Sequence, residues 1–179
     1  MNKQRFWLAF LLQVIVLLCI PAQAVYTTLT GRTVRLQTVP VDPYNWLTGY
    51  SQTLSYDISR VAALEKVAGV KPGFVKNGSV VYVTLESGKP GQSWKPIDMS
   101  LEKPIGLAEN KVALRGVVDR GAVVYGLETY YMPEAEKDQV NRTIIEAQRN
   151  KPAIVEVKID RFGNGIPIAV EVGGQRLKF

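Results

Sequence analysis

Few residues of this sequence have the types and spacing that catalysis requires. A Ser-Lys pair is the simplest system of nucleophile and base that needs no histidine. Ser51, Ser55 and Ser93 are candidates for the nucleophile, with Lys66 or Lys95 as the base. No spacing selects one pair over the others, and surface serines and lysines are common. A cell-envelope hydrolase of this type is therefore an alternative interpretation and not the leading one.

Paired carboxylates are the second candidate for chemistry. Glu128 and Glu134 could act as acid and base on a glycan. However, Glu134 follows Pro133 at the start of a predicted helix, where an acidic side chain complements the helix dipole. Asp160 and Asn164 lie in a glycine-rich turn, but the further acidic residues of a calcium-binding loop are absent. A carboxylate hydrolase therefore also stays an alternative.

The chain contains no histidine, and Cys19 is its single cysteine. Ser-His-Asp and Cys-His systems and metal sites with histidine ligands are therefore excluded. Because Cys19 lies in the apolar N-terminal segment, the folded part has neither an internal disulfide nor a thiol nucleophile. No Walker-type or dinucleotide-binding glycine motif is present. We predict no cofactor and no metal, and we favour a non-enzymatic function.

The net charge of +6, from 22 basic and 16 acidic residues, is spread along the chain. No run of basic residues interleaved with aromatic residues appears, as an arm that binds nucleic acid would require. The sequence therefore predicts a solvated basic surface and no nucleic-acid partner. A mild basic excess also suits an acidic partner or an anionic lipid surface.

Residues 1–26 have the order of a signal anchor or a signal peptide. Lys3 and Arg5 precede a stretch from Phe6 to Gly31 that contains no charged residue. This order is typical of exported or membrane-inserted chains, with the basic end kept in the cytoplasm. A helix over residues 6–26 would be about 30 Å long, enough to span a bilayer. We therefore expect residues 27–179 to form one domain in the periplasm or another extracytoplasmic space.

The fate of this N-terminal segment has two alternatives. Residues 21–24 end in an A-x-A pattern, so signal peptidase could cut after Ala24 and secrete a protein that begins at Val25. We favour retention as a membrane anchor, because the uncharged stretch is longer than the core of a minimal signal peptide.

The rest of the sequence is dominated by period-two alternation of apolar and polar residues, which is typical of half-buried strands. The pattern occurs around residues 34–36, 53–58, 81–85, 112–115, 123–127 and 155–159. Glycine-rich turns that suit hairpins separate these segments at residues 88–91, 119–121, 163–165 and 173–174. We predict a mainly β (α+β) fold, in the form of a small antiparallel barrel or sandwich.

Two segments interrupt this alternation. Residues 59–68 are predicted as a short helix or a turn-rich insertion before Gly69, with Pro72-Gly73 ending it. Residues 134–149 are predicted as the one substantial helix of the domain, because acidic residues follow Pro133 and apolar residues recur at helical spacing. The absence of repeats and linkers favours a single domain.

Two stretches of the chain resemble the bacterial GDYXXLXY protein family. In the first, Pro40, Asp42 and Pro43 match a P-x-D-P segment, and Gly49, Leu54 and Tyr56 match the motif that names the family. Tyr50 and Ser51 depart from that motif, which usually has Asp and Tyr there. The second stretch, residues 125–134, is similar to a late Tyr-Gly-x-Glu segment of the family that ends in Pro-Glu.

We expect an accessory or binding domain that acts with a multi-pass membrane protein. The resemblance implies an exported or membrane-anchored domain, often encoded beside such a protein, and it carries over no catalytic activity. It points to a motif surface formed by Asp42, Tyr44, Trp46, Gly49, Tyr50, Tyr56, Glu128 and Tyr130. These residues have two interpretations: a turn and strand needed for folding, or an aromatic loop that faces a membrane or a partner. A soluble, exported ligand-binding module is a further alternative for the whole chain.

Overall fold

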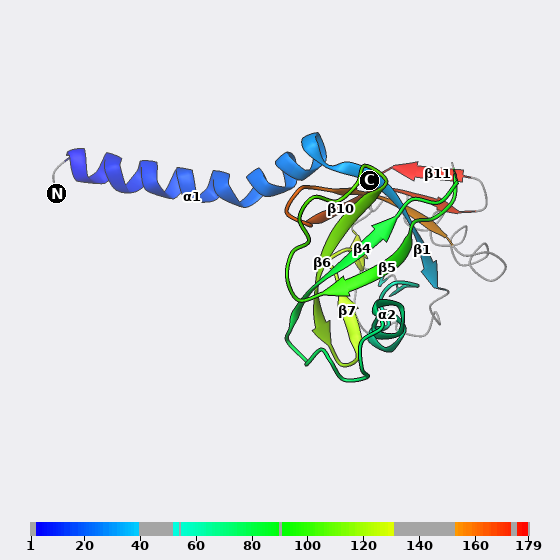
Figure 1. Ribbon diagram of the computed structural model, residues 1–179. Coiled ribbons are helices and arrows are strands. Elements are labelled where there is room, and N and C mark those ends of the chain that lie inside the picture. The colour runs from blue at the N-terminus through cyan, green and yellow to red at the C-terminus, as the bar shows by residue number, and fades with distance from the viewer. Residues whose placement is uncertain are drawn as a thin grey trace.

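A computed structural model describes residues 3–39, 52–53, 55–89, 91–130, 153–172 and 175–178. Helix α1 (Lys3–Thr30) projects away from a body of antiparallel sheets (Figure 1). The chain turns at Gly31 directly from this helix into the first strand of the body. The predicted N-terminal hydrophobic helix is therefore confirmed as a helix.

The body contains two main sheets, and every strand pairing within them is antiparallel. The first has the order β11-β10-β9-β1-β3 and consists of β1 (Arg32–Val39), β3 (Ser55–Tyr56), β9 (Ile154–Ile159), β10 (Gly165–Val172) and β11 (Gln175–Lys178). The second has the order β5-β4-β6-β7 and consists of β4 (Val80–Glu86), β5 (Lys95–Ser100), β6 (Lys111–Asp119) and β7 (Ala122–Val124). A short pair joins β2 (Gln52–Thr53) to β8 (Thr129–Tyr130).

The mainly β prediction is confirmed, and of its two forms the structure has the sandwich-like one. In the part of the chain that the structure describes, the sheets do not close into a barrel. Two backbone hydrogen bonds connect them instead, from the Arg115 amide to the Gly163 carbonyl and from the Trp94 amide to the Arg35 carbonyl, each at 2.8 Å.

The core lies between the faces that the alternation predicted to be apolar. In β9, Val155, Val157 and Ile159 are buried while the residues between them are half-buried. The same alternation runs along β6, where the exposed positions include Arg115 and Val117. Burial of one face of each strand is the physical reason for this period-two pattern.

The short helix is present as α2 (Val61–Ala68), and it ends earlier than Pro72-Gly73. Gly69, with φ of +67°, takes the left-handed conformation that terminates a helix, so this glycine ends α2. The turn at residues 119–121 is also confirmed. It has positive φ at both Arg120 and Gly121, as two-residue hairpins prefer.

The single strand expected over residues 53–58 is wrong. β2 pairs with β8, whereas β3 pairs with β1, so the two halves join different sheets. Asp57 and Ile58 lie in a turn, although Ile58 is buried as its apolar character predicts. The helix predicted at residues 134–149 and the turn predicted at 173–174 lie outside the described residues.

Candidate functional site

The described parts of the two stretches that carry the family resemblance lie side by side in the structure. Gln52 pairs with Tyr130 and Thr53 pairs with Thr129 in the β2–β8 ladder. Beside this ladder, the hydroxyl of Tyr56 donates a 2.8 Å hydrogen bond to the Leu127 carbonyl. The motif therefore holds together segments that are far apart in the sequence.

A second tyrosine makes the reciprocal bond. The Tyr125 hydroxyl donates to the Ile58 carbonyl at 2.6 Å, and the Glu128 carboxylate accepts the Tyr125 amide at 2.7 Å. Burial raises the pKa of Tyr125 well above its usual value, and the charges of Glu128 and Asp57 raise it further. The hydroxyl thus stays protonated and remains a donor. Tyr56 thus bonds to the second stretch, and Tyr125 of that stretch bonds to Ile58, two residues beyond the first. We call this pair of hydrogen bonds the tyrosine clamp.

The predicted motif surface divides between this clamp and residues outside the described ones. Tyr56 is buried and Glu128 is half-buried, and both bond to residues of the fold within or beside this clamp. Tyr130 lies in β8. The predicted positions outside the described residues are Asp42, Tyr44, Trp46, Gly49 and Tyr50. The aromatic loop that they would form stays a prediction.

The structure shows the surroundings of two of the hydrolase candidates, Ser93 and Lys95. Ser93 is buried, and the Lys95 amine lies 3.6 Å from the Asp57 carboxylate, which pairs with it in place of a serine. Burial raises the pKa of Asp57, and the charge of Lys95 opposes that shift. Within the described ranges, no group of three His, Cys, Asp or Glu residues could hold a metal ion. Ser51 and Glu134 lie outside these ranges.

A densely hydrogen-bonded polar site lies where α1 meets the turn between β9 and β10. Thr27 is fully buried, and its hydroxyl donates a 2.8 Å hydrogen bond to Asp160 Oδ2. The Asn164 side chain also donates to this oxygen, at 3.1 Å. The amides of Phe162 and Asn164 donate to Oδ1 at 2.8 and 3.0 Å. One carboxylate thus shapes the turn and fastens the end of α1 to it.

The charge of Asp160 is stabilised within this network. Burial on its own would raise the pKa of the carboxyl group, but hydrogen bonds from Asn164, Thr27 and the backbone outweigh that effect. The pKa of Asp160 therefore lies below its usual value, and the group is ionised at neutral pH. The turn uses this carboxylate as an acceptor, which explains the Asp160–Asn164 spacing without calcium.

Aromatic and cationic side chains surround the same junction. The rings of Tyr26 and Phe162 lie 6.0 Å apart. The Arg161 guanidinium lies 5.9 Å from the Tyr26 ring and 4.8 Å from the Phe162 ring, and the Lys103 amine lies 5.3 Å from the latter. These distances place both cations within reach of the aromatic faces.

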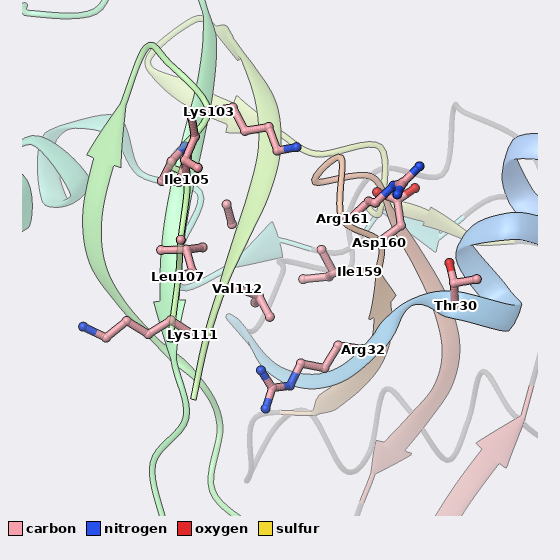
Figure 2. Close-up of a pocket in the computed structure, with 13 residues that line it drawn as sticks. Thr30, Arg32, Lys103, Ile105, Leu107, Lys111, Val112, Ile159, Asp160 and Arg161 are labelled. Carbon is pink, nitrogen blue, oxygen red and sulfur yellow. The ribbon is translucent and has the colours of Figure 1, made fainter. Parts of the chain in front are cut away.

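A cavity of about 380 Å³ lies between the loop at residues 103–107 and the end of β9 (Figure 2). Leu107, Val112 and Ile159 line it with apolar side chains, and Thr30 and Arg161 also contribute to its lining. Sequence reasoning did not identify this junction. A usable signal was present, because Arg161 and Phe162 put a cation and a large apolar ring at the tip of a hairpin turn.

Helix α1 bends at Pro21. A proline removes one backbone hydrogen bond and clashes with the preceding turn, which accounts for the bend. Among the described residues, no single helix is long and apolar enough to cross a membrane. The two parts of α1, Phe6–Cys19 and Pro21–Thr30, meet those requirements together across a bend of 40°.

Comparison with known proteins shows the family of this chain. A family model described as GDYXXLXY protein matches residues 13–170, a range that includes part of α1 and nearly all of the sheet body. No curated protein and no solved structure matches the chain.

Proposed function

Because this chain belongs to the GDYXXLXY family, whose function is unknown, we propose a role from its own geometry. In this proposal the protein is an accessory domain without catalytic activity of its own. Helix α1 anchors it in a membrane, the sheet body lies on the extracytoplasmic side, and the body acts on a membrane-protein partner.

The observation that carries this proposal is the exposure of apolar side chains all round α1. The apolar side chains of Leu8, Leu17 and Leu18, for example, are 72%, 65% and 64% exposed. A helix that is apolar on every side is expected to be buried, either in lipid or in another protein. The sheet body does not cover these side chains, so a membrane is the simplest environment for them.

The length of the apolar segment fits this environment. Residues 6–25 would be about 30 Å long as a helix, close to the thickness of the hydrocarbon core. Polar residues follow immediately, with Thr27 and Thr28 in the last turns of α1. The bilayer surface would then lie near Tyr26, directly beside the sheet body.

The attachment of α1 to the body supports an accessory role. Because Thr27 bonds to Asp160, the last turns of α1 and the β9–β10 turn form one unit. A body held in this way keeps a fixed position relative to the bilayer, which suits contact with the exposed loops of a multi-pass membrane protein. Lys3 and Arg5 at the other end of α1 favour retention of that end in the cytoplasm.

Extraction of membranes from cells that produce the full chain tests the anchor. We expect the wild-type protein to stay in the pellet after an alkaline carbonate wash. The double variant Leu11→Arg/Leu12→Arg should be released, since each arginine at mid-membrane costs about 2.5–3.5 kcal/mol. Leu29→Arg, which lies beyond the proposed span, is the matched control and should remain in the pellet. Release of the wild-type protein by carbonate would contradict the proposal.

Cross-linking in intact membranes tests the partner. We expect a multi-pass protein to be cross-linked to the wild-type body and lost with the Leu11→Arg/Leu12→Arg variant. A body that is cross-linked to no integral membrane protein, while α1 stays in the bilayer, would contradict the accessory role alone.

A further inference from the structure

We propose that the sheet body itself rests on the bilayer and binds the headgroups of anionic phospholipids. The contact is made by five residues around the base of α1, which we call the interfacial cluster: Tyr26, Lys103, Ile105, Arg161 and Phe162. This inference deepens the proposed function and rests on α1 being a membrane anchor.

The position of the cluster follows from the length of α1. If residues 6–25 fill the hydrocarbon core, Tyr26 is the first residue at the level of the headgroups. Its ring lies 6.0 Å from that of Phe162, so the β9–β10 turn is at the same level. Figure 1 shows this turn at the end of the body from which α1 emerges. Tyrosine is a residue type that membrane interfaces favour.

Two apolar side chains project at this end of the body. Ile105, in the loop between β5 and β6, is 96% exposed, and Phe162 is 47% exposed. Single exposed apolar residues are ordinary on a soluble surface. These two lie on loops that flank one cavity, next to the point where the chain would enter the bilayer. Insertion between headgroups would remove both from water.

The two cations of the cluster are available to bind an anion. Neither Lys103 nor Arg161 forms an ion pair with any residue that the structure describes. The neighbouring carboxylate, that of Asp160, is occupied by Thr27, Asn164 and backbone amides. Both side chains are exposed to solvent. Basic residues at a membrane surface attract anionic lipids.

The cavity arranges these groups at its rim. Figure 2 shows the Lys103 amine reaching across the opening toward the side of Arg161, whereas the Lys111 side chain extends away. Lys111 is paired with Glu86 at 3.5 Å, so it does not belong to the cluster. Below the rim, Leu107, Val112 and Ile159 line the cavity with apolar side chains, which cannot compete with an anion for the two cations. A phosphate at the rim would thus meet two cations from two different loops.

Site-specific probes in proteoliposomes test the inference on the full chain. In a Cys19→Ser background, an environment-sensitive nitrobenzoxadiazole label is attached at Ile105→Cys, at Val124→Cys or at Leu12→Cys. Val124 is 42% exposed on β7 and serves as the control for the rest of the body. Leu12 reports on α1. Vesicles contain phosphatidylcholine alone or with phosphatidylglycerol, and iodide quenching measures access to water.

We expect the label at residue 105 to be shielded from iodide at least about twofold more when phosphatidylglycerol is present. The label at residue 124 should stay accessible in both lipids. The double variant Lys103→Gln/Arg161→Gln should abolish the effect of phosphatidylglycerol at residue 105. The matched variant Lys76→Gln/Lys89→Gln, which removes two exposed cations elsewhere, should preserve it.

Three results would overturn the inference. If iodide reaches a label at residue 105 in both lipids while residue 12 is shielded, the sheet body does not contact the bilayer, although α1 is still a membrane anchor. Equal shielding in both lipids rejects recognition of anionic headgroups. An accessible label at residue 12 rejects the anchor and, with it, this inference.

Discussion

Thr27 and Asp160 show how two side chains can connect a helix to a sheet domain. The threonine is in the last turns of α1 and fully buried, and the aspartate begins the β9–β10 turn. The carboxylate accepts four donors within 3.1 Å, and one of them comes from α1. Since hydrogen bonds to a charged group are the stronger ones, this bond has a measurable share in stability.

Thr27→Val should lower the free energy of unfolding by about 1–3 kcal/mol, because a buried carboxylate loses one donor while the side-chain volume is kept. Urea unfolding of the full chain in detergent micelles measures the change. Thr28→Val is the control, since the Thr28 hydroxyl is exposed and bonds only to the Ala24 carbonyl within α1. A Thr27 variant as stable as this control would contradict the proposed role of the bond.

The same bond predicts a dependence on pH. The hydrogen bonds hold the pKa of folded Asp160 below its usual value, so their stabilisation is complete above about pH 4, the ordinary range for aspartate. It is lost as the pH falls through the folded-state pKa. The difference between wild type and Thr27→Val should therefore shrink on acidification. A difference that stays constant down to about pH 2 would contradict it.

At the scale of elements, the tyrosine clamp gives a structural role to Tyr56 of the family motif and to Tyr125 of the second stretch. Tyr56 donates to the Leu127 carbonyl of the second stretch, and Tyr125 donates to the Ile58 carbonyl just after β3. The turn after β3 and the segment between β7 and β8 are thereby held together, although neither is long enough to pair extensively. The motif residues that the structure describes thus serve the fold.

Tyr56→Phe and Tyr125→Phe should each lower the free energy of unfolding by about 1–3 kcal/mol, because each leaves a buried carbonyl without its donor. Denaturant unfolding measures both, and Tyr82→Phe on β4 is a control whose hydroxyl makes no hydrogen bond among the described residues. In the double variant the two losses should not simply add, since both bonds join the same two segments. Losses no larger than that of Tyr82→Phe would reject the clamp.

Much of the element structure could be predicted from the sequence because its causes are local. Alternation in β9 and the turn at residues 119–121 depend on neighbouring residues alone. The division of residues 52–58 between two sheets could not be predicted, since it depends on β8 and β1, which are distant in the sequence. For the same reason the sequence does not show that Lys103 and Arg161 flank one cavity.

At the scale of the whole molecule, the surfaces of α1 and of the sheet body suit different environments, one apolar and the other aqueous. The body buries one face of each strand in a core, whereas α1 exposes apolar side chains on all sides. The junction between them has an ordered sequence of environments: apolar up to Val25, aromatic at Tyr26, and cationic at Arg161 and Lys103. This order matches the profile of a bilayer from its core to its headgroups.

Retention of α1 is the last prediction, and the membrane proposals depend on it. Intact-mass measurement of the chain extracted from membranes should give a protein that still contains residues before Val25. The variant Ala22→Leu/Ala24→Leu, which removes the small residues that signal peptidase requires, should have the same N-terminus and the same need for detergent as the wild type. Cleavage would instead remove Lys3 and Arg5 and lower the net charge from +6 to +4. A wild-type protein that begins at Val25 and leaves the membrane in high salt, beside a variant that stays, would show that the body functions unanchored. The Thr27–Asp160 bond would then hold only a short helical remnant, and the interfacial cluster would have no bilayer beside it.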